Sequence, residues 1–202
     1  MAHSDSPHVA DPAADAGYLS GQLLIAMPGI GDPRFERAVV LICAHDEEHA
    51  MGLAVNRPVD GLMLADLLDR LSIEPQPEAA PALAEPVMIG GPVERERGFV
   101  LHTDDYRSDN SLPVAPGMVL TATREVLERL ACGEGPRRSL MALGYSGWGA
   151  GQLEREIREN VWLTCPADEA LLFGDDHDHK WSQALAKIGV DPGLLSAASG
   201  RA

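Results

Sequence analysis

The chain has 202 residues, and 31 acidic side chains against 16 basic ones give it a formal net charge of −15. This charge repels phosphate backbones and supplies few cations for the counterion release that drives nucleic-acid binding. Direct nucleic-acid recognition is therefore a disfavoured hypothesis. No apolar run approaches the roughly 18 residues of a membrane span, and the first residues lack the basic start of a signal peptide. We expect a cytoplasmic protein without membrane contact.

The three cysteines, Cys43, Cys132 and Cys165, are odd in number and form no C-x-x-C pair. Neither a disulfide framework nor a zinc clip is indicated by this spacing. We expect reduced thiols that are mostly packed in the interior, and no resident cofactor.

The N-terminal part of the chain starts with residues 1–17, which have no apolar period and are predicted to be a disordered tail. Residues 23–27 are an apolar run before a Pro-Gly pair, which predicts a buried strand and a turn. Asp32 and Pro33 are typical of the N-cap and first position of a helical turn. Residues 38–44 are uncharged and β-branched, which predicts a central strand covered on both faces.

A hairpin and a helix are predicted next. Residues 45–49 are expected to form a solvated turn, and residues 52–55 the antiparallel partner strand, which Pro58 ends. Leucines three and four residues apart predict an amphipathic helix over residues 62–71. A loop rich in proline and alanine follows at residues 74–86.

The middle of the chain alternates short strands with turns. Strands at residues 87–89 and 99–102 flank a tight corner at Gly90 and Gly91, where we expect a positive φ at glycine. A polar loop separates them from a further strand at residues 118–120.

The C-terminal third begins with a predicted helix over residues 123–132, closed by a glycine. A strand at 139–143 leads through the glycine-rich residues 144–151 into a helix that ends near residue 160. Charged pairs at i,i+4 on that helix are expected to face solvent. A strand at 161–164 follows.

The last elements are a helical turn capped by Asp168 and a helix over residues 181–188. Predicted strands occur both as hairpin neighbours and as partners separated by helices, which indicates an α+β fold with a mixed sheet. We expect a single domain over residues 18–190 and a C-terminal tail at residues 191–202.

An ordered series of short motifs rich in glycine, proline and aromatic residues runs along the chain. They are GQLLIAMP at 21–28, DPRF at 32–35, MGLAVNRP at 51–58, GGPV at 90–93, GFVLH at 98–102, GYSGW at 144–148 and GQLE at 151–154. Together they resemble the AlgH/YqgE family of bacterial proteins, over about residues 20–190. The resemblance implies a mixed, bifurcated β-sheet wrapped into a pseudo-barrel with flanking helices. It also brings the family label of transcriptional regulator, without an assigned reaction.

A thiol chemistry is conceivable at Cys43 and His45, which lie two residues apart on a predicted strand. Their side chains are then expected on one face, where an imidazole would assist a thiolate in an enzyme or redox sensor. The alternative is that Cys43 is a small core residue whose burial raises its pKa. We favour this alternative.

Two further motifs resemble chemical sites. Ser146 lies in a glycine-rich segment that resembles the G-x-S-x-G nucleophile elbow or an anion cradle, but Trp148 replaces the last glycine of the elbow. We expect the glycines to allow close packing and Trp148 to fill the core or cover a pocket. Residues 175–179 carry aspartates and histidines, but consecutive loop residues seldom close a ligand shell, so we expect no metal site.

Polar side chains at strand ends beside the glycine corner are the best candidates for a ligand or partner site. The candidates are Asp32, His45, Asn56, Gly90, Gly91, His102 and Trp148. Capping and turn formation are their alternative role. No complete catalytic constellation is present, so we expect a non-catalytic regulatory or binding protein that acts through a protein or small-molecule partner. The sequence leaves its oligomeric state open.

Overall fold

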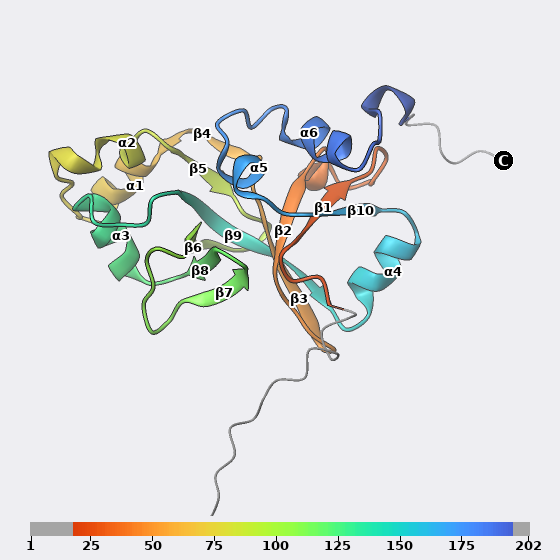
Figure 1. The fold of residues 1–202 in the computed structure, drawn as a ribbon, viewed down its shortest axis with the longest axis horizontal. Helices are drawn as coiled ribbons and strands as arrows, with labels where there is room; N and C mark the ends of the chain where they lie inside the picture. Colours follow the sequence, from red (N-terminus) through yellow and green to blue (C-terminus); the bar gives the residue numbers. More distant parts are fainter. Residues whose placement is uncertain (1–17, 196–202) are drawn as a thin grey trace, which may run out of the picture.

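A computed structural model describes residues 18–195, which form strands, short α-helices and 3-10 turns (Figure 1). The strands are β1 (Gln22–Ala26), β2 (Val39–His45), β3 (His49–Ala54), β4 (Pro58–Met63), β5 (Pro86–Ile89), β6 (Val93–Thr103), β7 (Leu112–Ala115), β8 (Met118–Thr121), β9 (Ser139–Gly149) and β10 (Trp162–Pro166). The α-helices are α1 (Leu64–Arg70), α2 (Ala80–Leu83), α3 (Arg124–Ala131), α4 (Gln152–Arg158), α5 (Glu169–Phe173) and α6 (Lys180–Lys187). The 3-10 turns are η1 (Pro33–Phe35), η2 (Pro77–Ala79) and η3 (Pro192–Leu194).

The strands form one sheet in the order β10-β1-β2-β3-β9-β6-β8-β7, with β5 beside β9 and β4 beside β5. Among the strands of residues 18–195, only β5 and β9 pair in parallel. The sheet divides along β9, whose residues Ala142 and Leu143 pair with β5, whereas Ser146–Gly149 pair with β3. The predicted α+β fold with a mixed, bifurcated sheet is confirmed.

The corner between β5 and β6 packs directly against the backbone of β9 at the point of division. A Cβ atom added to Gly90 would lie 2.2 Å from the carbonyl oxygen of Gly144, and one added to Gly91 would lie 2.1 Å from the carbonyl carbon of Tyr145. Positive φ is found at Gly144 (72°) but not at Gly90 or Gly91. The expectation of a positive φ at this corner is therefore wrong, and close backbone approach is the reason for both glycines.

The sheet curls into a half-barrel, so that its two ends approach one another. A Cβ atom on Gly21, just before β1, would lie 2.9 Å from Cβ of Ala115 at the end of β7. The largest core cluster fills the inside of this curl with side chains from β1, β2, β6, β8 and β9, among them Leu41 and Leu101. Helices α5 and α6 cover it from the top in Figure 1, and Trp181 of α6 belongs to the cluster.

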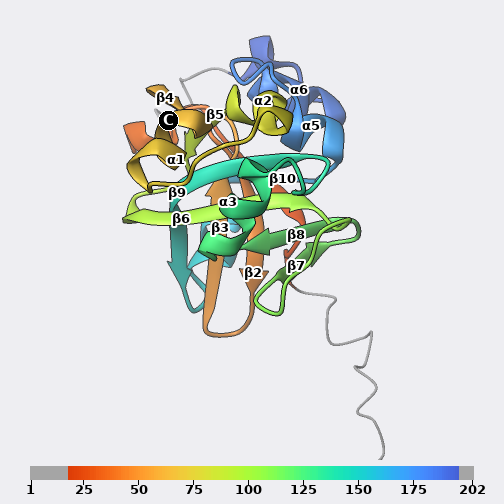
Figure 2. The same ribbon diagram turned by 90° about the vertical axis from the view of Figure 1, so that its left-hand side faces the viewer.

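Two smaller clusters attach the remaining helices. Helices α1 and α3 pack on one side of the sheet through Leu68, Leu127 and Met141 (Figure 2). Helix α4 lies on the opposite side in Figure 1 and packs through Leu153 on β2, β3 and β10. The helices therefore flank the sheet in separate groups.

Several predicted boundaries move because neighbouring strands supply partners. Pro58 begins β4 instead of ending the preceding strand, since the first residue of an edge strand needs no ladder donor. The glycine-rich segment after residue 143 continues as β9, because β3 pairs with it. The expected loop at residues 74–86 contains η2 and α2, and β7 replaces part of the loop before β8.

The predicted tail at residues 1–17 lies outside the described residues. Within the predicted C-terminal tail, η3 occupies Pro192–Leu194. Across residues 18–195, no helix combines the length and apolar character needed to cross a membrane.

Candidate functional site

The sequence motifs at 32–35, 51–58 and 90–93 meet around one hollow of about 270 Å³. We call it the arginine hollow. It is lined by Arg34, Phe35, Ala54, Arg57, Val59, Ile89, Gly91, Pro92, Arg95 and Leu143. Its walls thus come from η1, the ends of β3 and β5, the starts of β4 and β6, and the middle of β9.

Asp32 builds the η1 wall, as its predicted N-cap role requires. Its carboxylate accepts a hydrogen bond from the backbone N–H of Arg34 at 3.0 Å. The Arg34 guanidinium also donates through Nη2 to Oδ2 of Asp32 at 2.7 Å, and through Nε to both carboxylate oxygens of Asp32. These hydrogen bonds from Arg34 lower the pKa of Asp32. Asp32 therefore positions and neutralises Arg34 and does not itself line the hollow.

Asn56 connects this wall to the sheet. Its Oδ1 accepts from Val39 N at 2.9 Å, and its Nδ2 donates to the carbonyl oxygen of Arg37 at 2.9 Å. Beside it, the carbonyl oxygen of Arg57 accepts from Ile89 N at 2.7 Å, which ties β4 to β5. Asn56 thus uses one donor and one acceptor of its amide to hold the backbone beside Arg57.

The charges around the hollow are unequally compensated. Arg57 donates through Nη1 to the carbonyl oxygen of Glu36 at 3.0 Å. Within residues 18–195, neither Arg57 nor Arg95 has a carboxylate oxygen within 4.0 Å, whereas Arg34 is paired with Asp32. Two uncompensated cations therefore border an apolar hollow in a strongly acidic protein.

Two segments beside the arginine hollow, the residues after η1 and the start of β6, also contain residues with an unfavourable backbone conformation. Arg37 after η1 has φ 52°, and Glu94 beside Arg95 has φ 45°. Non-glycine residues in this region of φ are uncommon and cost of order 1–3 kcal/mol each. Ser72 and Asn160 also have positive φ, at 55° and 57°, so two of the four such residues in the described chain flank the hollow.

Two larger hollows differ from the arginine hollow in their charge. Trp148 lines one of about 460 Å³ together with Arg97, but Arg97 is paired with Glu94 at 3.0 Å and lies over the Phe99 ring. A hollow of about 680 Å³ lies beside α6, where the Arg37 guanidinium stacks on Trp181. The cations of both hollows already have partners.

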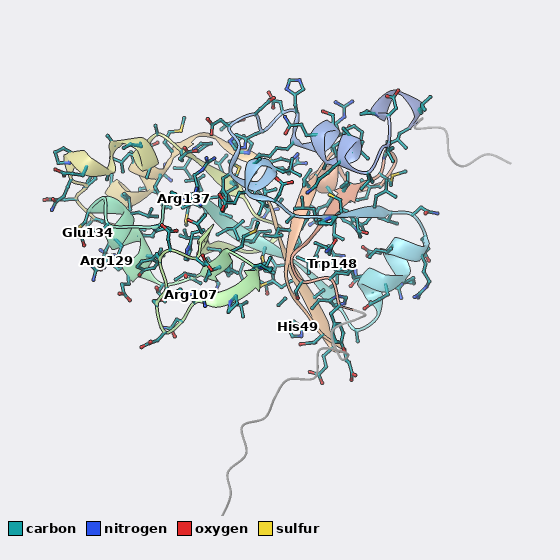
Figure 3. All side chains as sticks on the ribbon, viewed as in Figure 1. His49, Arg107, Arg129, Glu134, Arg137 and Trp148 are labelled. Atoms are coloured by element: carbon teal, nitrogen blue, oxygen red, sulfur yellow. The ribbon has the colours of Figure 1, made fainter. Side chains whose placement is uncertain are left out.

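Trp148 and His45 both belong to the α4 side of the molecule (Figure 3 labels Trp148). The indoles of Trp148 and Trp162 both donate to Oε2 of Glu156, at 2.9 and 2.8 Å. His45 is buried, accepts from Leu19 N through Nδ1 at 3.0 Å, and contacts Glu154 through Nε2 at 2.8 Å. The expected solvated turn is therefore wrong at His45, and Glu154 does not simply face solvent.

His102 is fully buried at the C-terminal end of β6, the strand that also carries Arg95, and belongs to a polar network. Its Nδ1 donates to the carbonyl oxygen of Thr103 at 2.8 Å, and its Nε2 accepts from the Thr121 hydroxyl at 2.8 Å. Thr121 in turn contacts the Ser111 hydroxyl at 2.8 Å. Both ring nitrogens are satisfied inside the protein, so His102 does not line the arginine hollow.

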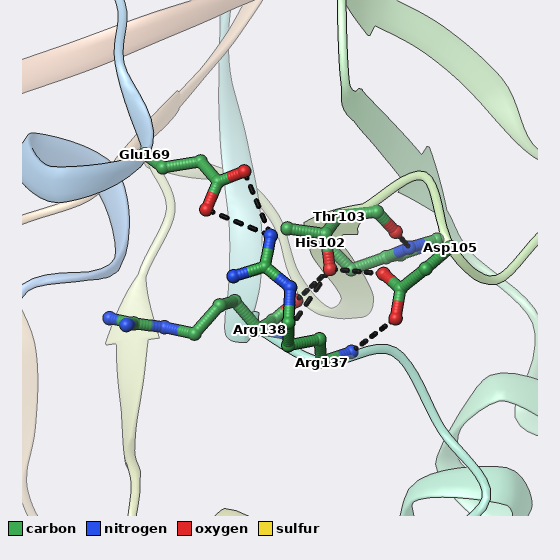
Figure 4. Close-up of polar contacts among 6 residues, drawn as sticks. All are labelled: His102, Thr103, Asp105, Arg137, Arg138 and Glu169. Atoms are coloured by element: carbon green, nitrogen blue, oxygen red, sulfur yellow. Dashed lines mark hydrogen bonds and ion pairs between the residues drawn. The ribbon is translucent and has the colours of Figure 1, made fainter.

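A charged cluster next to His102 was missed by the sequence reasoning (Figure 4). Asp105 accepts from the Thr103 hydroxyl and from Arg137 N, the latter at 2.9 Å. Arg137 also pairs with both oxygens of Glu169 at 3.0 Å. Pairs separated by 32 residues or more leave no local pattern that a sequence can show. The cluster ties α5 to the start of β9.

Cys43 and His45 do not share a face. The pairing of β2 with β3 shifts between Ile42 and Ala44, which places one extra residue at Cys43. Cys43 therefore points into the barrel core, whereas His45 points toward α4. Burial raises the pKa of Cys43 to about 12, which leaves almost no thiolate at neutral pH.

The remaining chemical candidates are also structural. Ser146 is buried on β9, and its hydroxyl has no hydrogen-bond partner among the described residues. A strand position without a base is not a nucleophile elbow. In the described part of the chain, no three His, Cys, Asp or Glu side chains are grouped to hold a metal ion. His179 instead pairs with Asp176 at 2.7 Å.

Comparison with known proteins places these features in a family. The model of the AlgH-like family matches residues 23–193. The chain belongs to the AlgH-like family. A UPF0301 protein of Caulobacter vibrioides is 60% identical over 190 residues, covering 93% of this chain and 96% of that protein. A UPF0301 protein of Nitrobacter hamburgensis is 51% identical, covering 94% and 90%. The family has no assigned catalytic function.

Solved structures of the AlgH-like fold agree. The solution structure of the AlgH protein from Pseudomonas aeruginosa matches with a TM-score of 0.73 and 39% identity, and the match covers both chains fully. A crystal structure of a protein from Corynebacterium diphtheriae matches with a TM-score of 0.69 at 21% identity, over 95% of this chain and 99% of that one. The second match shows a shared fold alone.

Thiol labelling tests the assignment of Cys43. Cys132 is exposed and Cys43 is buried, so we expect iodoacetamide to modify Cys132 first in the folded protein. Mass spectrometry after brief labelling should find Cys43 unmodified until the protein is unfolded in urea. Labelling of Cys43 at the rate of Cys132 would show that its thiol is accessible and ionised.

The His102 network predicts a loss of stability in acid. Burial lowers the pKa of His102 below its ordinary value of 6.5. The unfolded chain therefore takes up a proton near pH 6.5 and the folded chain only at lower pH, so the free energy of unfolding falls as pH drops below about 6.5. Urea denaturation at pH 7.5 and 5.5 should show a smaller fall for His102→Gln than for the wild type.

His177, whose pKa is also lowered mainly by burial, leaves part of the pH dependence in that variant. An equal fall in both proteins would show that His102 does not contribute to the pH dependence.

Proposed function

We propose that the protein is a non-catalytic regulatory or binding module of the cytoplasm that recognises its partner at the arginine hollow. The observation that carries the proposal is the position of Arg57 and Arg95 beside apolar walls, without carboxylate partners among the described residues. Ligand sites are mostly apolar hollows with a few placed polar groups. The strained residues Arg37 and Glu94 flank the same walls.

The alternatives have less support. A thiol enzyme or redox sensor would need an ionised Cys43 near His45, but burial and the shifted strand register oppose both conditions. A direct nucleic-acid contact would need a broad basic surface, and a net charge of −15 opposes it. If the protein regulates transcription, a bound partner or small molecule is the route that fits its surface charge.

A titration with an apolar anion tests the proposal. We expect 8-anilinonaphthalene-1-sulfonate, added to ¹⁵N-labelled protein, to shift the amide resonances of Arg57, Ile89 and Gly91 saturably. The double variant Arg57→Gln/Arg95→Gln should bind the dye more weakly, because it removes both uncompensated charges. Arg107→Gln is the control, since Arg107 (labelled in Figure 3) is exposed and does not line the hollow.

Saturable shifts confined to the hollow beside Trp148, or none at all, would contradict the proposal. Equal dye affinity of the wild type and the double variant would do the same.

A further inference from the structure

We infer that the arginine hollow takes a small amphipathic carboxylate, with its hydrocarbon group against the apolar walls and its carboxylate between Arg57 and Arg95. The inference rests on the proposed function and specifies the chemical class of the ligand. Size, wall chemistry, charge and the shape of the surrounding surface each restrict that class.

The walls select for an apolar group. Phe35, Val59, Ile89 and Leu143 line the hollow, and Ile89 is 43% exposed. A volume of about 270 Å³ corresponds to about nine water molecules at ~30 Å³ each. This space holds a short acyl chain or one aromatic ring system. Burial of such a group is favourable at roughly 25 cal/mol per Å² of apolar surface.

The rim selects for a carboxylate. Arginine presents five N–H donors in a planar fork that matches the two oxygens of a carboxylate. Arg57 uses one Nη1 bond on a backbone carbonyl, which fixes the side chain and leaves other donors for a ligand. Arg34 is already neutralised by Asp32, so we expect the carboxylate of the ligand to bind Arg57 and Arg95 instead.

The surroundings select against a polyanion. Glu94 and Glu96 are exposed on either side of Arg95 along β6, and Glu36 is exposed after η1. Glu94 is paired with Arg97, but the exposed Glu36 and Glu96 add negative charge around the hollow and disfavour a ligand with several negative charges. A ligand with one carboxylate meets the least repulsion from these residues, whereas a polyphosphate or a run of acidic residues meets more.

The neighbouring strand edge selects against an extended peptide. Strand β4 has β5 as its only strand partner in the described chain, but its pairing is irregular between Pro58 and Met63. Pro58 lacks a backbone donor, and Gly61 has φ 68°. An edge interrupted in this way does not template an added strand. The occupant is therefore a small molecule.

A comparison of the affinities of three ligands with the same hydrocarbon chain tests the inference. Octanoate, octanol and octylammonium share one hydrocarbon chain and differ in charge, and each is titrated below its micelle or solubility limit against the full-length protein by calorimetry. We expect octanoate to bind about tenfold more tightly than octanol and octylammonium to bind most weakly. Arg57→Gln/Arg95→Gln should remove the preference for octanoate, while Arg107→Gln retains it.

Ile89→Ser tests the wall separately. It should weaken octanoate and octanol alike, because it removes apolar contact without changing charge, and circular dichroism checks that the variant is folded. Acetate, which has the carboxylate without the chain, should bind far more weakly than octanoate.

The outcomes separate the two proposals. Equal affinity for octanoate and octanol, or tighter binding of a tetraglutamate peptide than of octanoate, overturns the ligand class but leaves the hollow as a binding site. Binding of octanoate that neither the arginine variant nor Ile89→Ser weakens places it elsewhere and overturns the inference. Failure of octanoate, octanol and the naphthalene dye alike contradicts the proposed function as well.

Discussion

The structure depends on one contact between two stretches of backbone, where the corner of Gly90 and Gly91 fits against β9 at Gly144. No side chain fits there, because any Cβ on Gly90 or Gly91 would overlap main-chain atoms of β9. Hydrogen bonds complete the junction: Gly90 N donates to Leu143 O and Ala54 N donates to Gly90 O, both at 2.8 Å. The corner thereby joins β3, β5 and β9 at the place where the sheet divides.

The candidate site is a consequence of this junction. The hollow lies beside this junction, and its lining includes Ala54 at the end of β3, Gly91 of the corner and Leu143 of β9. Arg57 lies just before β4 and Arg95 lies on β6, and Asn56 holds the backbone that follows η1. The same geometry accounts for the glycines of the corner motif, which allow stretches of backbone to approach closely beside the hollow.

Local features were predictable from the sequence and long-range ones were not. The buried β2 run, the Asp32 cap and the helix closed by Gly133 follow from periodicity and capping rules, and the structure confirms them. The separation of Cys43 from His45 depends on a shifted register with β3, which no local pattern records. For the site, the sequence pointed to Asp32, Asn56 and the glycine corner, and Gly91 of the corner does line the hollow. The side chains of Asp32 and Asn56 are used in capping and backbone contacts, and the neighbouring Arg34 and Arg57 line the hollow instead. His102 and Trp148 lie outside the hollow, where they form hydrogen bonds with Thr121 and Glu156.

The most direct test of the central contact is the free energy of unfolding of Gly91→Ala, measured by urea denaturation beside Gly149→Ala. Gly149 lies on the same β9 strand, and an added Cβ there meets no atom within 4 Å. Overpacking predicts that Gly91→Ala loses about 2 kcal/mol or more, while Gly149→Ala changes by less than about 0.5 kcal/mol. An equal free energy of unfolding for the two variants would contradict the account, because the contact between the corner and β9 would then not require a residue without a side chain.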